Sequence, residues 1–336
     1  MEILCAKPLK APRLEQVRAF LSGLGLDFDA GVETTVVLLE DGAVIATGSR
    51  ENNVLKCIGV CADNQGEGLS AIVITELVKD ALYSGITHLF LFTKPQNIHL
   101  FQELGFFCIA KTAETALMEN RREGIERFAA SLEKPDTGAG KTGAIVANCN
   151  PFTNGHLHLI ETAAAACAVL HVFVLSEEKS DFSFETRMAL VRAGTAHMPN
   201  VLVHPTGDYL ISSATFPDYF MKDKNRAREI NCELDLTIFA QRFAVPMRID
   251  TRFVGSEPHC PVTASYNRQM HDVLPKFGIA VTEIERMEQQ GRAVSASHVR
   301  ELLAQRNLRA IKPLVPETTY RYLERMRADE AGGAVR

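Results

Sequence analysis

The carboxy-terminal half of the chain repeats one pattern, in which a short apolar run is followed by a polar turn and a helical segment. The apolar runs lie at residues 144–149, 171–175, 200–204, 247–254 and 279–284, and the helical patterns at 156–168, 184–197, 223–243, 262–276 and 297–305. Apolar strands without alternation are typical of a parallel sheet with helices on both faces. We therefore predict an α/β domain with a Rossmann-like parallel sheet, whose ligands bind beyond the carboxyl ends of its strands.

The amino-terminal part has short β-like runs around two helices. Predicted strands lie at residues 34–39, 43–47, 54–60, 88–93 and 106–109. A glycine-containing loop at 65–70 opens a helix that ends near residue 83. This pattern predicts a separate α+β domain, because 336 residues exceed the usual size of one hydrophobic core. We expect one domain at 1–130, a polar and Gly-rich linker at 131–142, and a second domain at 143–336.

The composition excludes several classes of partner. A formal net charge of -5 without a Lys/Arg cluster gives no reason to expect nucleic acid. No apolar run reaches the roughly 20 residues of a membrane span, and the first residues lack a signal-peptide core. The eight cysteines form no CxxC pair, which indicates free thiols in a reducing compartment and argues against structural zinc. We expect a cytoplasmic protein whose partner is a small molecule or another protein.

The linker contains a misleading motif. The residues GKT at 140–142 look like the end of a Walker A loop. The first glycine of that motif would fall at Pro135, and the segment precedes a strand instead of following one. A P-loop is therefore excluded.

The turn between the first apolar run and the Ala-rich helix predicts a phosphate site. The free N–H groups of a first helical turn carry partial positive charge, and a glycine lets the backbone turn tightly into the helix. A threonine hydroxyl and a histidine imidazole join the same concavity. The predicted site consists of Asn150, Pro151, Phe152, Thr153, Gly155 and His156.

Polar segments also follow three other predicted strands, at residues 179–187, 254–258 and 294–300. Each is compatible with ordinary capping and turn chemistry alone. In the last segment, Ser295, Ser297 and Arg300 gather hydroxyls and a planar guanidinium fork at a helix start. Together the segments predict a phosphate cradle at one edge of the sheet.

The amino-terminal loop carries a resemblance to a known fold. The order of elements, the loop Gln65-x-x-Gly68-x-Ser70 and the segment from Asn97 to residue 106 resemble the GCN5-related acetyltransferases. In that family the glycine loop wraps the pyrophosphate of coenzyme A. The resemblance implies that a coenzyme-A-like arm is bound by Gln65, Gly66, Gly68, Ser70 and Asn97.

Two positions depart from that family. Ser70 stands where members usually have Gly or Ala, which is a mild change at the loop. Phe101 stands where many members carry a tyrosine that protonates the departing thiolate, and a phenyl ring cannot donate a proton. We therefore expect a domain that binds the arm without standard acetyl transfer. The alternative is a domain retained only for packing.

Two further resemblances concern the second domain. The pair formed by residues 153–156 and 295–300 resembles the signatures (H/T)xGH and ISSTxxR of the nucleotidyltransferase superfamily. The segments NPFTNGH, KSDFSFETR, YLISSATFPDYF, FVGSEPHCPVTASYN and SASHVR occur in the order seen in the citrate lyase ligase family, which also has an acetyltransferase-like amino-terminal domain.

This second resemblance implies an AMP-forming acid–thiol ligase. ATP and acetate would give acetyl-adenylate and pyrophosphate. The acetyl group would then move to the thiol of the coenzyme-A-like prosthetic group on the acyl-carrier subunit of citrate lyase, which releases AMP.

The residues suit this chemistry, because in-line attack of acetate on the α-phosphate needs positioning and charge stabilisation. We assign His156, Lys179 and Arg300 as hydrogen-bond donors to the phosphates, and Thr153 as the residue that orients one phosphate oxygen. The remaining assignments are Ser295 and Ser297 at the β- and γ-phosphates, Gly255 and Ser256 at the nucleotide, and Tyr209 and Ser213 near the acyl group. Arg187 is either a phosphate contact or part of a helix salt bridge. Mg²⁺ is expected to bridge the phosphates with few protein ligands.

Other functions stay open at this level. One is an acetate ligase for another acyl-carrier subunit. A second is a metabolic adenylyltransferase that forms a nucleotidylated product, and a third is a noncatalytic module that binds coenzyme-A-like groups.

Overall fold

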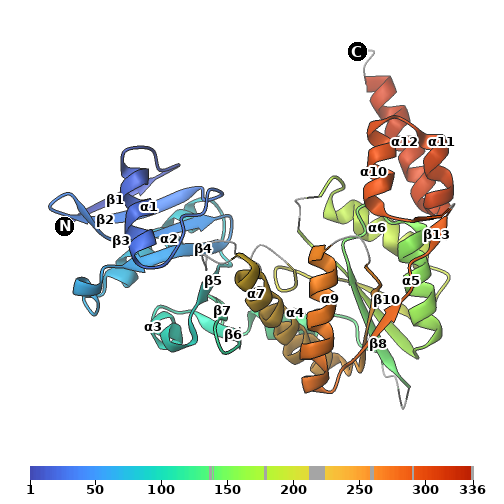
Figure 1. Cartoon of the computed structure of the whole chain (residues 1–336), viewed down its shortest axis with the longest axis horizontal. Coiled ribbons are helices and arrows are strands. Elements are labelled where there is room, and N and C mark those ends of the chain that lie inside the picture. The colour runs from blue at the N-terminus through green and yellow to red at the C-terminus, as the bar shows by residue number, and fades with distance from the viewer. Residues whose placement is uncertain are drawn as a thin grey trace. The chain divides into compact units, whose positions relative to one another are not determined.

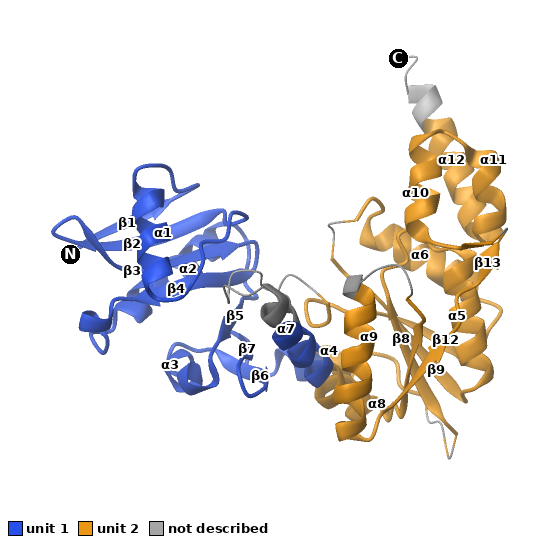
Figure 2. Ribbon diagram, viewed as in Figure 1, with its two compact units in different colours: residues 1–127, 213–238 blue, residues 128–212, 239–336 orange. Residues whose placement is uncertain are grey.

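The structure is a computed structural model that describes residues 1–135, 138, 140–177, 180–211, 224–257, 261–289 and 291–333. The chain forms two compact units (Figure 2). The first contains residues 1–127 and the described part of 213–238, and the second contains the described parts of 128–212 and 239–336.

The first unit is built on a seven-stranded sheet in the order β1-β2-β3-β4-β5-β7-β6 (Figure 1). Its strands are β1 Glu2–Ala6, β2 Thr34–Glu40, β3 Ala43–Glu51, β4 Val54–Val60, β5 Phe90–Thr93, β6 Phe107–Lys111 and β7 Ala116–Glu119. Its α-helices are α1 Arg13–Gly23, α2 Leu69–Tyr83, α3 Ile98–Glu103 and α7 Lys224–Ile238, with short 3-10 turns η1 Ala62–Asn64 and η2 Pro95–Asn97.

Strands β4 and β5 are the parallel pair of this otherwise antiparallel sheet, and they pair over only two positions. Val54 lies opposite Phe90 and Leu55 opposite Leu91, after which β4 continues to Val60 without a partner on that side. Helix α2 covers β2, β3 and β4. It lies so close to β3 that a Cβ on Gly48 would be 2.5 Å from Val73 Cγ1. The sheet is therefore packed under α2 and open between two of its strands.

The second unit contains a five-stranded, wholly parallel sheet in the order β10-β9-β8-β11-β12. Its strands are β8 Thr142–Ala147, β9 Val169–Val174, β10 Val201–Pro205, β11 Thr251–Gly255 and β12 Ala280–Ile284. The helices that connect them include α5 Asn154–Ala165, α6 Phe184–Thr195, the π-helix η3 Phe239–Ala244, α8 Val245–Met247, α9 Pro261–Val273 and the 3-10 turn η4 Leu274–Phe277. The strand order reverses between β8 and β11, where the carboxyl ends of adjacent strands leave a crevice for ligands.

The last part of the chain adds a helical cluster. The hairpin strands β13 Glu288–Gln289 and β14 Arg292–Ala293 lead into α10 Ala296–Ala304, α11 Leu308–Ile311, η5 Lys312–Leu314 and α12 Glu317–Gly333. A core of buried leucine, isoleucine and valine side chains holds these helices together. Figure 1 shows α10, α11 and α12 side by side beyond the sheet.

The predicted fold class is confirmed, with an α+β first part and a parallel-sheet second part. Each predicted strand of the second unit is present within a few residues, because uninterrupted apolar runs formed buried strands; all six residues of β9 are buried. The unit boundary after Arg127 lies near the expected division at 130. Helix α7, which sequence analysis assigned to the second domain, packs against β6 and groups with the first unit.

Candidate functional site

Helix α5 begins with a capping box. Thr153 is the N-cap, and its hydroxyl accepts a hydrogen bond from the backbone N–H of His156 at 3.3 Å. The backbone N–H of Thr153 donates to Nδ1 of His156 at 3.1 Å. The side chain of each residue thus satisfies a backbone donor of the other, which fixes the imidazole against the helix start.

The cap fixes the tautomer of His156, and the surroundings of the ring fix its charge. Because Nδ1 accepts from a backbone N–H, the neutral ring carries its proton on Nε2. The Thr153 hydroxyl, 2.9 Å from Nδ1, must then donate to the same nitrogen. Burial and the nearby positive charge of Arg286 lower the pKa of His156 to about 4. At neutral pH, His156 therefore acts as a hydrogen-bond donor through Nε2 and does not carry a positive charge.

Gly155 has a different role from the predicted one. It lies inside the first turn of α5 and is not among the positive-φ glycines of the described chain. A Cβ at this position would be 2.7 Å from the carbonyl oxygen of Val294. The absence of a side chain lets α5 lie against the segment that opens α10, so Gly155 brings the two signature segments together.

Helix α10 begins with the second signature segment. Ser295 is the N-cap, and its hydroxyl accepts from the backbone N–H of His298 at 3.2 Å. Ser297 follows in the first turn, and both serines line the same cavity as Thr153, Gly155 and His156. The predicted meeting of these two segments is thus present in the structure.

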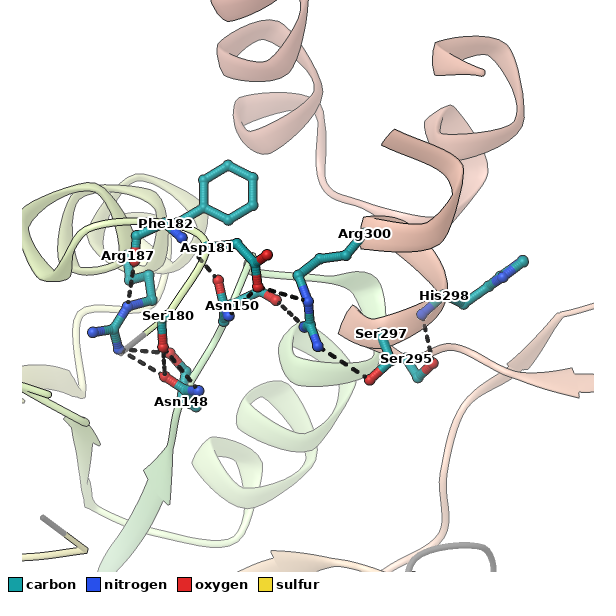
Figure 3. Close-up of polar contacts among 10 residues, drawn as sticks. All are labelled: Asn148, Asn150, Ser180, Asp181, Phe182, Arg187, Ser295, Ser297, His298 and Arg300. Carbon is teal, nitrogen blue, oxygen red and sulfur yellow. Dashed lines mark hydrogen bonds and ion pairs between the residues drawn. The ribbon is translucent and has the colours of Figure 1, made fainter. Parts of the chain in front are cut away.

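Three contacts engage the guanidinium nitrogens of Arg300 (Figure 3). Its Nη1 donates to the carbonyl oxygen of Asn150 at 2.6 Å, its Nε lies 2.9 Å from Asp181 Oδ2, and its Nη2 lies 3.4 Å from Ser297 Oγ. Arg300 is absent from the described residues that line the cavity. In this state it ties α10 to the loop after β8.

Asn150, Pro151 and Phe152 shape that loop from within. Asn150 is buried, its Oδ1 accepts from the backbone N–H of Phe182 at 3.1 Å, and its Nδ2 donates to Asp181. Phe152 is fully buried and stacks on the His156 ring with 6.0 Å between centroids. None of the three is among the described residues that line the cavity; Asn150 instead contacts Arg300, and Phe152 contacts His156.

Arg187 is neither of the two things expected from the sequence. Its side chain is fully buried, and its guanidinium donates to the backbone carbonyl of Phe182 and to both the carbonyl oxygen and Oδ1 of Asn148 (Figure 3). It also donates to the backbone carbonyls of Leu175 and Glu177. These contacts join the ends of β8 and β9 to the start of α6. A periodic sequence pattern could not reveal this, because the acceptors are backbone atoms brought together by the fold.

The end of β11 forms the opposite wall. Gly255 lines the cavity, has open space at its Cβ position, and accepts at its carbonyl from Asn267 Nδ2 on α9 at 3.1 Å. The next residue, Ser256, donates its backbone N–H to Ile284 and accepts at its carbonyl from Arg286 Nε at 2.7 Å. Ser256 therefore supports the wall through its backbone.

The cavity enclosed by these elements has a volume of about 1020 Å³. It lies at the carboxyl ends of β8 and β11, where the strand order reverses. Sequence reasoning missed several residues that line it, namely Tyr266, Asn267 and Arg286, whereas Glu257 belongs to the predicted polar segment 254–258. Arg286 follows the end of β12 by two residues, and that position was the one available signal.

Of three other predicted positions, the structure describes only Tyr209. Lys179 and Ser213 lie outside the described residues. Tyr209 is 3% exposed, and its ring packs against Phe128 with 5.3 Å between centroids. Tyr209 is also absent from the described cavity lining, so the structure shows it as a buried packing residue.

The predicted arm-binding residues lie around the start of α2 and of α3. Gln65 follows η1, Gly66 and Gly68 have φ values of 90° and 76°, and Ser70 lies in the first turn of α2. Asn97 precedes α3. Gly68 is the N-cap of α2, and no side chain caps this helix. Within the described residues, the backbone N–H groups of Leu69 and Ser70 have no hydrogen-bond partner.

Several other features of the chain bear on its partners. None of the helices in the described segments is long and apolar enough to cross a membrane. The same segments contain no group of three or more His, Cys, Asp or Glu side chains placed to hold a metal ion. The seven described cysteines are free thiols.

Comparisons with known proteins identify the family of this chain. The family model of the citrate lyase ligase C-terminal domain matches residues 142–323. Two solved structures are similar at low identity. Thermotoga maritima TmcAL bound with alpha-thio ATP is 14% identical, with a TM-score of 0.38 over 56% of each chain. An acyl-CoA N-acyltransferase from Pseudomonas aeruginosa is 11% identical, with a TM-score of 0.32 over 36% of this chain and 100% of that one. The citrate (pro-3S)-lyase ligase of Klebsiella pneumoniae is 42% identical over 324 residues, which is 95% of each chain. The chain therefore belongs to the citrate (pro-3S)-lyase ligase family.

Proposed function

We propose that this enzyme activates acetate with ATP and acetylates the prosthetic-group thiol of the acyl-carrier subunit of citrate lyase. The observation that carries the proposal is the 42% sequence identity to a citrate (pro-3S)-lyase ligase over 95% of each chain. The geometry supports it, because the cavity at the sheet edge combines an N–H donor on His156 with the hydroxyls of Ser295 and Ser297. Such donors stabilise charge that develops on phosphate oxygens.

The first step is adenylation. An acetate oxygen attacks the α-phosphorus, the bond from that phosphorus to the bridging oxygen breaks, and pyrophosphate leaves with the electron pair. His156 donates a hydrogen bond from Nε2 and keeps its proton, because its pKa of about 4 leaves the ring neutral. Thr153 serves by holding the imidazole in this orientation. Mg²⁺ would enter with the triphosphate and would neutralise part of its negative charge.

The second step is acetyl transfer. The carrier thiolate attacks the acetyl carbon of acetyl-adenylate, the bond to the phosphate oxygen breaks, and AMP leaves. We assign adenylation to residues 143–336 and binding of the prosthetic arm to residues 1–130. The unpaired side of β4 and the free N–H groups at the start of α2 support this, since a helix start without a side-chain cap binds an anionic pyrophosphate.

The location is proposed as cytoplasmic, which agrees with the free thiols of the described cysteines. Phe101 is buried in the core against α2, so it contributes packing in the first unit. We therefore propose that this unit presents the arm and that the carboxy-terminal unit performs the chemistry.

Incubation with ATP, Mg²⁺, acetate and deacetylated citrate lyase tests the proposal. We expect acetate-dependent release of AMP and pyrophosphate together with restored citrate cleavage. AMP release with restoration of a different carrier enzyme would indicate another acyl-carrier partner. A nucleotidylated product in place of AMP would indicate a metabolic adenylyltransferase.

A further inference from the structure

Arg286 lies in the cavity of the second unit and has no role in the assignments made from the sequence. It follows the end of β12 by two residues, at the same sheet edge as the ends of β8 and β11. Its side chain is 30% exposed and lines the cavity together with His156 and Ser297. A guanidinium in this position is accessible to an anionic ligand.

The contacts of Arg286 fix the guanidinium without using all of its donors. Its Nε donates to the carbonyl oxygen of Ser256 at 2.7 Å, and its Nη2 forms an ion pair with Glu257 Oε2. Glu257 is only 6% exposed, so this pair is largely shielded from water. Nη1 has no partner within the described parts of the chain. Two contacts hold the fork while one nitrogen remains available.

Arg300, the arginine chosen from the signature motif, shows the opposite arrangement. All three of its nitrogens have protein partners, including the carboxylate of Asp181 (Figure 3). The described cavity lining includes Arg286 but not Arg300. Arg286 is also the charged group that, after burial, lowers the pKa of His156, which places its charge near the imidazole.

We propose that Arg286 is a catalytic residue for adenylation, whose free guanidinium nitrogen donates to nonbridging phosphate oxygens of ATP beside His156. This inference rests on the proposed function. As the bond from the acetate oxygen to the α-phosphorus forms and pyrophosphate departs, the guanidinium balances the negative charge and keeps its proton. Glu257 is a positioning residue, because its carboxylate fixes the plane of the fork.

The test compares ATP with adenosine, which shares the nucleoside but lacks the phosphates. Arg286→Gln alone removes the cation that pairs with the shielded Glu257 carboxylate and can destabilise the fold. The double variant Arg286→Gln with Glu257→Gln removes both charges together and keeps the test decisive. Arg321→Gln, on the exposed face of α12, is the matched control for loss of an arginine.

Two measurements decide the inference. In the double variant, we expect acetate-dependent exchange between pyrophosphate and ATP to fall about 100- to 1000-fold. We also expect the Kd for ATP to rise at least about tenfold while the Kd for adenosine stays within about threefold, because only ATP carries the phosphates. Arg286→Lys should recover part of the ATP affinity and little of the exchange rate, since an ammonium is a point charge without the fork. The Arg321 variant should match the wild type.

The outcomes separate this inference from the proposed function. Exchange within about threefold of wild type in the double variant, or equal weakening of ATP and adenosine binding, would overturn the role of Arg286. A wild-type protein without acetate-dependent exchange would overturn the proposed function. In that case the comparison of ATP and adenosine, which needs no turnover, still decides whether Arg286 contacts the phosphates.

Discussion

The two units each have a glycine at the start of a helix, Gly155 inside the first turn of α5 and Gly68 at the N-cap of α2, but the loops that lead into these two helices differ. In the second unit, the loop before α5 is closed: Thr153 caps the helix, Gly155 lies against Val294, and one imidazole N–H is left to the ligand. In the first unit, the loop before α2 is open: Gly68 adopts a left-handed conformation, no side chain caps the helix, and open space surrounds its Cβ position.

The difference indicates two kinds of anion recognition. A closed loop gives a single donor with a fixed direction, which suits a site where a phosphorus atom reacts. An open helix start offers backbone N–H groups to a pyrophosphate that is bound but not changed. The following changes test this contrast, beginning with the largest expected effect.

Replacement of His156 with alanine removes the donor of the closed loop. We expect acetate-dependent exchange between pyrophosphate and ATP to fall by about 100- to 1000-fold, because the group that stabilises phosphate charge is lost. The fold should persist, as monitored by circular dichroism and urea unfolding, since Thr153 still caps α5. His158→Ala, on the same helix and outside the described cavity lining, is the control. Retained exchange in the His156 variant would contradict the assignment.

Gly155→Ala tests how closely the two signature segments must approach. The added methyl group would meet the Val294 carbonyl at 2.7 Å, and a backbone atom cannot move aside as a flexible side chain does. We expect a loss of about 1–3 kcal/mol in the free energy of unfolding, together with slower exchange. Urea denaturation measures the first effect.

Gly255→Ala provides the comparison for Gly155→Ala, because nothing lies within 4 Å of its Cβ position. Its free energy of unfolding should match that of the wild type. Equal stability losses in the two variants would show that the contact with Val294 is not the cause.

Lower pH should weaken the unit that contains the closed loop. Burial lowers the pKa values of His156, His171 and His204 to about 4, with the Arg286 charge adding to the shift of His156. Their unfolded-state pKa is about 6.5, so the unfolded chain binds protons first as the pH falls. Stability is therefore complete above about pH 6.5 and is lost progressively toward pH 4, by about 1–2 kcal/mol per histidine between pH 7 and pH 5.

Urea unfolding of the second unit at pH 7 and at pH 5 measures this loss as a difference in the free energy of unfolding. The double variant His171→Phe with His204→Leu removes a buried pair whose ring nitrogens are 2.9 Å apart. Its pH dependence should be shallower than that of the wild type. An unchanged slope would exclude this pair as a source of acid sensitivity.

The sequence pattern predicted elements with a strong apolar signal and missed those without one. The strands of the parallel sheet were found because they are apolar throughout, whereas β1, with alternating exposure at a sheet edge, and the four-residue β7 gave no comparable signal. The polar helix α12 was missed for the same reason. Helix α7 was predicted, but the spacing of its apolar residues could not show which of the two sheets it packs against.

The site divides in a similar way. The signature residues around His156 and Ser295 could be identified because short motifs at helix starts bind anions for a known physical reason. The pairing of Arg300 with Asp181, and that of Arg286 with Glu257, depends on segments that only the fold brings together. Sequence alone could therefore name the arginine in a motif, but it could not show which arginine faces the cavity.

The smallest expected effect concerns the open loop, where Gly68→Ala adds a methyl group at φ 76°. The strained backbone should cost about 1–2 kcal/mol of stability. The control is Gly25→Ala in the same unit, which also has φ 76° and open space at Cβ, so the same strain applies without a proposed ligand nearby.

With coenzyme A as the probe, calorimetry should show weaker binding to the Gly68 variant than to the Gly25 variant. Exchange between pyrophosphate and ATP should be equal in both variants, because the proposed adenylation site lies in the second unit. Equal coenzyme A affinities would mean that the open loop does not bind the arm, and the contrast between the two loops would then be one of backbone geometry alone.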